Sequence, residues 1–268
     1  MALRVWNGSS YIKADIPRVG TVTPKAGYIW DGSKMVKVWP ERGYVGASST
    51  FSSITTPSLT AGSSNRFTAN VPADSQSGDL LIAQFSWVYS ATFGTCPVTA
   101  ASGWTILSSY RPGLNTPPIN ISTLWGWHTG ASTVNFLIDG NSGSAGGCHV
   151  GMVAIRGATG IASSAGDYWS AKATSTLLPS RSVAANQMVV YGLGGVCDES
   201  VRNDATWPTL TEAVDIAGVR DFSGYTHTNG VTMAYSGITS GAGSIQPTVN
   251  TTTERLHRAG AGVVIQMG

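Results

Sequence analysis

Carboxylates are the side chains of this sequence that could act as acid and base, and the chain contains only 14 Asp and Glu among 268 residues. Asp198-Glu199 and Asp215 are the candidates for the carboxylate pair with which a glycosidase cleaves a sugar bond, but their spacing gives no support to that arrangement. A G-x-S-x-G nucleophile turn, an H-E-x-x-H zinc motif and a phosphate loop are absent from the sequence. We therefore expect no catalytic residue and no cofactor, and predict that the chain is not an enzyme.

Cysteine and histidine are the usual ligands of zinc, and the chain has three Cys and four His. Cys96, Cys148 and Cys197 form no C-x-x-C pair, and no two histidines stand at ligand spacing. The sequence thus predicts no metal site. We expect the cysteines to be buried free thiols that pack as small apolar side chains.

Aromatic side chains offer the best case for a binding site. Trp125, Trp127 and Trp169 could stack on the sugar rings of a glycan, and we treat them as the candidate glycan platform. The alternative is core packing, because Trp125 and Trp127 share the parity of apolar neighbours on an alternating strand. Trp104 and Trp207 stand at matching places in two halves of the chain, which favours a structural role for them.

Two short segments near the start of the chain repeat one pattern. Each has an apolar residue and a Trp, then Asn-Gly or Asp-Gly, then an alternating strand, which is typical of a β-hairpin with a tight turn. Because a lone hairpin is marginal in water, we expect the two hairpins to dock on a larger surface. The candidate assembly and anchoring residues are Trp6, Asn7, Gly8, Trp30, Asp31 and Gly32.

The interval from residue 41 to residue 53 is rich in Gly, Ser and Thr and predicts a connector. We therefore expect a hairpin module at residues 1–46 and a larger β domain at residues 47–268. The length of the chain suits one large domain and a small additional module.

The larger part of the chain shows one order of strands twice, in rounds of about residues 53–160 and 161–268. Leu80 to Trp87 and Met188 to Leu193 are nearly continuous apolar runs, typical of central strands covered on both faces. Ile119 to Trp127 alternates and predicts a half-buried strand. We predict an internal duplication, with chance similarity of short strands as the alternative.

The composition favours strands over helices. Charged residues make up 11% of the chain and Gly accounts for 33 residues, whereas ordinary domains carry roughly 25% charged residues. Such a chain suits short strands joined by tight turns. We predict an all-β, antiparallel β-sandwich of the jelly-roll kind, with strands from both rounds in each sheet, and two tandem sandwiches as the alternative.

Charge and hydropathy bear on the partners. The net charge is +2 and no run of Lys or Arg exceeds two residues, so we expect no nucleic-acid partner. The apolar stretches are far shorter than the roughly 20 residues that span a bilayer, and no basic and apolar leader opens the chain. We therefore expect synthesis in a cytoplasm and no membrane insertion.

Five motifs follow one another between Ser53 and Gly157. They are Thr56-Pro57-Ser58, Gly78-Asp79-Leu80-Leu81-Ile82-Ala83, Gly103-Trp104-Thr105-Ile106-Leu107, Leu124-Trp125-Gly126-Trp127 and Val153-Ala154-Ile155-Arg156-Gly157. In this order they resemble the β-sandwich repeat of phage minor tail proteins and of some bacterial surface proteins. The Trp-Asn-Gly-Ser and Trp-Asp-Gly-Ser units resemble short repeats in minor tail proteins of phages that infect actinobacteria. The second round departs from the pattern, with Asn186-Gln187 in place of Gly-Asp and Gln266-Met267 in place of Arg-Gly.

The resemblance implies a structural protein of a tailed-bacteriophage particle, located in the virion. Its expected partners are other virion proteins and further copies of itself, in a homo-oligomer. A capsid decoration or head-fibre role is the nearest alternative. The alternative of a different class is a carbohydrate-binding adhesin domain, whose partner is a glycan on the host cell surface.

Overall fold

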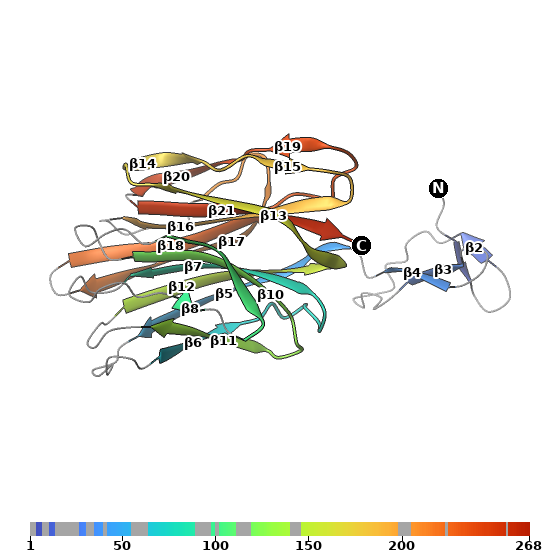
Figure 1. Ribbon diagram of the computed structural model, residues 1–268, viewed down its shortest axis with the longest axis horizontal. Helices are drawn as coiled ribbons and strands as arrows, with labels where there is room; N and C mark the ends of the chain where they lie inside the picture. Colours follow the sequence, from blue (N-terminus) through green and yellow to red (C-terminus); the bar gives the residue numbers. More distant parts are fainter. Residues whose placement is uncertain are drawn as a thin grey trace. The chain divides into compact units, whose positions relative to one another are not determined.

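The structure is a computed structural model of the whole chain. It describes residues 4–6, 11–13, 27–30, 35–39, 42–54, 64–88, 98–99, 102–110, 119–139, 146–197, 205–222, 225–255 and 257–268. Within these ranges every regular element is a β-strand, and all strand pairs are antiparallel (Figure 1). The predicted all-β class is therefore confirmed. None of the described residues belongs to a helix long and apolar enough to cross a membrane.

The chain divides into two compact units, residues 1–42 and residues 43–268. The small unit contains a hairpin at each of the two repeated segments. The paired strands are β1 (Arg4–Trp6) with β2 (Tyr11–Lys13), and β3 (Gly27–Trp30) with β4 (Met35–Trp39).

The prediction of a connector at residues 41–53 is wrong. Gly43–Ile54 forms β5, which pairs along its length with β12 (Gly146–Arg156). Its small polar side chains have a use in this position, since the hydroxyl of Ser48 donates to the carbonyl oxygen of Asn70 at 2.6 Å. Tertiary pairing thus outweighs the weak strand propensity of Gly and Ser. Along the chain, the boundary between the two units falls after residue 42, ahead of β5, and not at residue 46.

Residues 43–268 form four stacked layers of sheet (Figure 1). The further strands of the first round are β6 (Ser64–Asn70), β7 (Leu80–Val88), β8 (Val98–Thr99), β9 (Trp104–Tyr110), β10 (Ile119–Trp127) and β11 (Thr133–Asp139). Those of the second are β13 (Ala158–Trp169), β14 (Ala173–Leu177), β15 (Arg181–Val183), β16 (Gln187–Cys197), β17 (Thr211–Phe222), β18 (Tyr225–Tyr235), β19 (Gly243–Ile245), β20 (Thr248–Arg255) and β21 (His257–Met267).

Two five-stranded sheets make the inner layers. Their orders are β5-β12-β7-β10-β9 and β13-β21-β16-β18-β17. One outer layer is the sheet β6-β11-β8, and the other consists of the pairs β14-β20 and β15-β19. We call the two five-stranded sheets the inner sheets, and the contact between them the joint.

Both faces of each inner sheet are covered. On β7, Leu81 and Phe85 pack beneath the sheet β6-β11-β8, whereas Leu80 and Ile82 pack across the joint. This accounts for the nearly continuous apolar run along β7. The alternating strand β10 is also covered on both faces, so the prediction that it is half-buried is wrong. Ser122, on its polar face, is fully buried and hydrogen-bonded.

The single sandwich with strands of both rounds in each sheet is wrong. Every strand of one inner sheet comes from residues 43–156, and every strand of the other from residues 158–267. The chain turns from one sheet into the other at Gly157, whose φ of 73° suits glycine. Strands therefore pair within their own round, and the apolar faces left over are buried against each other.

Glycines let the inner sheets approach closely. A Cβ added to Gly192 of β16 would collide with Oε1 of Gln84 on β7, and one added to Gly194 would lie 2.7 Å from Cγ2 of Ile121. Gly151 of β12 likewise faces Val214 across the joint, with 2.9 Å between the added Cβ and Cγ1. Larger side chains at these places would push the sheets apart.

Candidate functional site

The predicted anchoring residues lie in the small unit. Trp6 is the last residue of β1 and pairs with Tyr11, and Trp30 is the last residue of β3 and pairs with Met35. Only the backbones of these two tryptophans are described. The four turn residues of the prediction, Asn7, Gly8, Asp31 and Gly32, lie outside the described residues. The anchoring role therefore stays a prediction.

The structure brings together two of the three tryptophans of the predicted glycan platform. The rings of Trp125 and Trp127 meet edge to face, with centroids 6.0 Å apart and planes at 84°. Trp125 is half-buried against the joint, while Trp127 is 38% exposed. Trp169 packs against a different cluster, beneath the outer pairs β14-β20 and β15-β19. The three rings thus form no common surface, and Trp127 is the most exposed of them.

The matching tryptophans Trp104 and Trp207 both pack against core clusters, Trp104 partly buried and Trp207 buried. The Trp104 ring meets Phe136 edge to face, with centroids 4.9 Å apart, and lies over Gly126, where an added Cβ would be 2.7 Å from Cδ2. Trp207 is buried, and its indole Nε1 donates to Oγ1 of Thr232 at 2.8 Å. Neither ring is presented as a stacking platform.

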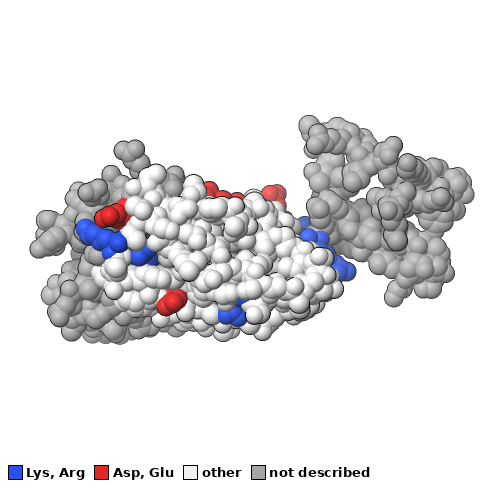
Figure 2. All heavy atoms as spheres, turned by 90° about the horizontal axis from the view of Figure 1, so that it is seen from above, with Lys and Arg blue, Asp and Glu red and all other residues white. Residues whose placement is uncertain are grey.

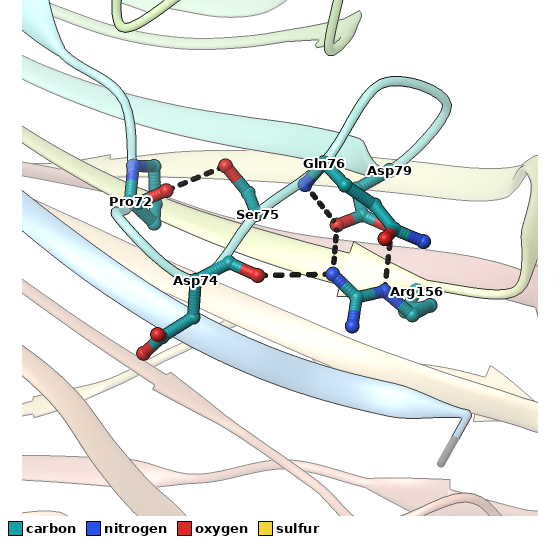
Figure 3. Close-up of polar contacts among 6 residues, drawn as sticks. All are labelled: Pro72, Asp74, Ser75, Gln76, Asp79 and Arg156. Atoms are coloured by element: carbon teal, nitrogen blue, oxygen red, sulfur yellow. Dashed lines mark hydrogen bonds and ion pairs between the residues drawn. The ribbon is translucent and has the colours of Figure 1, made fainter. Parts of the chain in front are cut away.

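A buried carboxylate and an arginine connect the start of β7 to the end of β12 (Figure 3). Asp79 is 2% exposed. Nε of Arg156 donates to its Oδ1 at 3.0 Å, and Nη2 donates to Oδ2 at 2.8 Å. Oδ2 also accepts the backbone N–H of Gln76 at 2.8 Å, and Nη2 donates to the carbonyl oxygen of Asp74 at 2.9 Å. Such a bidentate pair fixes geometry as well as charge. We call it the clasp.

The clasp serves structure because its groups are already engaged. Both carboxylate oxygens of Asp79 accept hydrogen bonds from the protein, and the backbone on either side is bound to His128: Gly78 N–H donates to the His128 carbonyl, and His128 N–H to that of Asp79, each at 2.8 Å. The arrangement holds the loop before β7 onto the sheet. In the sequence both residues lie within the motifs that carry the resemblance, and no spacing between them indicates their contact.

The second round has a neutral counterpart of the clasp. Nε2 of Gln187 donates to Oε1 of Gln266 at 2.9 Å. Oε1 of Gln187 accepts the backbone N–H of Ala184 at 2.8 Å, as Asp79 accepts that of Gln76. The preceding residue, Asn186, has a φ of 58°, where the first round has a glycine. The departures from the motif pattern thus coincide with a change from a charged to a neutral contact.

Polar side chains are buried at the joint. Oγ1 of Thr123 donates to Oε1 of Gln84 at 2.7 Å, and Nδ2 of Asn229 donates to the carbonyl oxygen of Ser86 at 2.8 Å. His149 is fully buried, and burial lowers the pKa of its imidazole from 6.5 to about 4. The joint therefore holds this histidine neutral at physiological pH.

Stacked tyrosines stand at both edges of the joint. Tyr44 of β5 stacks on Tyr235 of β18, with centroids 4.1 Å apart and planes at 9°. Tyr110 of β9 stacks on Tyr168 of β13, with centroids 3.4 Å apart and planes at 14°. No spacing in the sequence could signal these pairs, since each joins one inner sheet to the other.

The remaining chemical candidates are structural where the structure describes them. Cys148 is a buried free thiol, as predicted, and burial raises its pKa. Oδ2 of Asp215 accepts the backbone N–H of Ala205 at 3.0 Å, while Asp198 and Glu199 lie outside the described residues. Among the residues with described placement, no group of three or more His, Cys, Asp or Glu could hold a metal ion.

No family model matches the chain, and neither the comparison with curated proteins nor that with solved structures found a match.

Proposed function

We propose that the chain is a structural, non-enzymatic protein of a tailed-phage particle, of the minor-tail or surface-appendage kind. Its partners would be other virion proteins and further copies of itself. The observation that carries the proposal is that one chain contains both a large β stack and a separate small unit of two very short hairpins. Strands of three to five residues bury little apolar surface among themselves, so the small unit gains stability from a partner surface.

We infer further that the large unit is two jelly rolls that arose by duplication. The strands of each round pair in nested order, first with last: β5 with β12, β6 with β11 and β7 with β10, then β13 with β21, β14 with β20 and β16 with β18. Nested pairing of this kind is what rolling one long hairpin into two sheets produces. The order of strands in the two inner sheets also corresponds position by position.

Two finer details support the duplication. The turn hydrogen bonds of Gly78 and Asp79 with His128 recur as Asn186 N–H to the Thr239 carbonyl, 2.9 Å, and Thr239 N–H to the Gln187 carbonyl, 2.7 Å. Across the joint, β9 lies on β13 and β5 lies on β17. These are equivalent edges with their roles exchanged, as in the contact between two identical subunits.

Assembly through strand edges suits this architecture. The edge strands of the inner sheets are β5, β9, β13 and β17, and unpaired edges are places where another chain can add a strand. Two of them carry exposed apolar side chains, Phe51 on β5 and Ile106 on β9. The face of the large unit seen in Figure 2 carries only scattered charged side chains.

Deletion of residues 1–42 tests the proposal. We expect the shortened chain to keep the β signature of the full chain in circular dichroism, because the large unit has its own core. We also expect it to be lost from purified particles of the phage that encodes it. A shortened chain that folds and is still incorporated at the level of the full chain would contradict the anchoring role.

A carbohydrate-binding adhesin is the second candidate, favoured by the exposure of Trp127. The edge-to-face contact with Trp125 would hold the Trp127 ring in place for stacking on a sugar. Trp127→Ala should then abolish binding to host cell wall or to a glycan array, whereas Trp169→Phe, a change in another cluster, should leave binding intact. Equal binding by both variants would remove this candidate.

The decoration or head-fibre role is a further alternative. It would be favoured if a label on this protein marked the head of the particle rather than the tail.

A further inference from the structure

Three rings stand in a row at one edge of the joint: Tyr110 on β9, Tyr168 on β13 and His257 on β21. The two phenol rings are stacked, with centroids 3.4 Å apart. The hydroxyl oxygen of Tyr168 lies 2.8 Å from Nδ1 of His257, and those two rings are nearly coplanar in orientation, at 8°. His257 is 3% exposed, while both tyrosines are half-buried and thus open to small solutes on one side.

This geometry suits oxidation of a phenol by one electron. Loss of an electron makes the phenolic O–H strongly acidic, so a base already in contact with that O–H speeds the reaction by taking the proton. In the tautomer of His257 that carries its proton on Nε2, Nδ1 is such a base for Tyr168. Burial and the hydrogen bond with Tyr168 raise the pKa of Tyr110, so Tyr110 is a protonated phenol at neutral pH.

We propose that Tyr110 and Tyr168 form an oxidative cross-linking site, at which a one-electron oxidant converts the stacked pair into a dityrosine that joins β9 to β13. Each phenol gives one electron to the oxidant and one proton, that of Tyr168 to Nδ1 of His257 and that of Tyr110 to solvent. The two radicals form one C–C bond between ring carbons beside the hydroxyls. The hydrogens on those carbons then move to the oxygens, which restores both phenols, so two electrons and two protons leave in all.

The cross-link would make the joint covalent. The inner sheets belong to different rounds of the chain and meet through side-chain packing and buried hydrogen bonds. A bond between β9 and β13 would prevent the two rounds from separating without unfolding both sheets. This inference rests on the geometry of the joint and is independent of the proposed function.

The opposite edge of the joint provides a matched control within the same chain. Tyr44 and Tyr235 are also stacked, with centroids 4.1 Å apart and planes at 9°, and both are half-buried. In the described part of the chain, no histidine is stacked on or hydrogen-bonded to either of them. A comparison of the two pairs therefore gives the combined contribution of the shorter separation and of His257.

The test exposes the dilute full-length chain to photogenerated ruthenium(III) tris-bipyridine, with persulfate as the final electron acceptor, and follows cross-linked peptides by mass spectrometry. We expect the link between Tyr110 and Tyr168 to form first and within one chain. His257→Asn keeps an acceptor but removes the base, and should slow this link at least about tenfold; a positioned base contributes roughly 10²–10⁴, and solvent takes part of that role here. The link between Tyr44 and Tyr235 should keep its rate.

Tyr168→Phe keeps the ring and should abolish the first link alone. Equal rates for the two wild-type links, or links from Tyr110 mainly to other tyrosines, would overturn the proposal. An unchanged rate in a folded His257→Asn variant would overturn the role of the histidine. Should that variant fail to fold by circular dichroism, the wild-type comparison and the Tyr168→Phe variant decide the outcome.

Discussion

The clasp of the first round can be exchanged for the neutral contact of the second. The substitutions are Asp79→Gln and Arg156→Gln, singly and together, so that the double variant copies Gln187 and Gln266. Both sites share the turn whose backbone N–H donates to the first side chain, at 2.8 Å in each case. The double variant therefore tests whether the charges or the hydrogen-bonded geometry stabilises the start of β7.

The two single variants should differ in cost. Without Arg156, the carboxylate of Asp79 stays buried, with its side chain 3% exposed, and keeps only the hydrogen bond from Gln76. Breaking a buried pair in this way costs about 3 kcal/mol, the lower end for such pairs. Without Asp79, the arginine side chain is 17% exposed and retains the carbonyl of Asp74, so we expect a loss of about 2 kcal/mol.

The double variant should cost clearly less than the sum of the two. We expect a loss of about 3 kcal/mol in place of about 5 kcal/mol, which is a coupling of about 2 kcal/mol. The reason is that the double variant leaves no buried charge without its partner. Urea unfolding of the full chain, followed by tryptophan fluorescence, gives the four free energies of the cycle. Additive losses would show that the two side chains act separately, and the interpretation of the clasp would then be wrong.

Two further predictions concern the joint. The pKa of His149 is lowered from 6.5 to about 4 in the folded chain, so its contribution to the free energy of unfolding is complete above pH 6.5 and falls by about 3 kcal/mol as the pH drops towards 4. His149→Phe should flatten that part of the plot of unfolding free energy against pH. An unchanged plot would contradict the burial of a neutral imidazole. Gly192→Ala should lower the free energy of unfolding by about 1–3 kcal/mol, because the added Cβ meets Gln84. The control is Gly241→Ala, where nothing lies within 4 Å of the added Cβ, and it should leave the unfolding midpoint unchanged. Equal midpoints for the two variants would mean that the sheets are not in close contact.

Much of the strand placement could be predicted from the sequence, because apolar runs and apolar alternation mark extended segments. The continuous run of β7 and the alternation of β10 both mark real strands. Periodicity does not say what covers each face, so the four layers could not be derived from it. Ser and Gly in β5 misled the prediction because their local preference is for loops, while pairing with β12 decides the conformation.

The candidate site was predictable only where parity was enough. Trp125 and Trp127 share a face, as their spacing indicates, but nothing in the sequence could separate Trp169 from them. The contacts of Tyr110 with Tyr168, and of Gln84 with Gly192 of β16, cross between sheets. Contacts of that kind depend on how the layers stack, which is a property of the whole fold.

Labelling of intact particles tests the central proposal most directly. If the proposal holds, an antibody raised against residues 43–268 should mark the tail or its appendages in regular copies, when imaged by electron microscopy on purified particles of a phage whose genome carries this sequence. Absence of label from the particles, with the same antibody detecting the chain free in the lysate, would contradict a structural role in the virion.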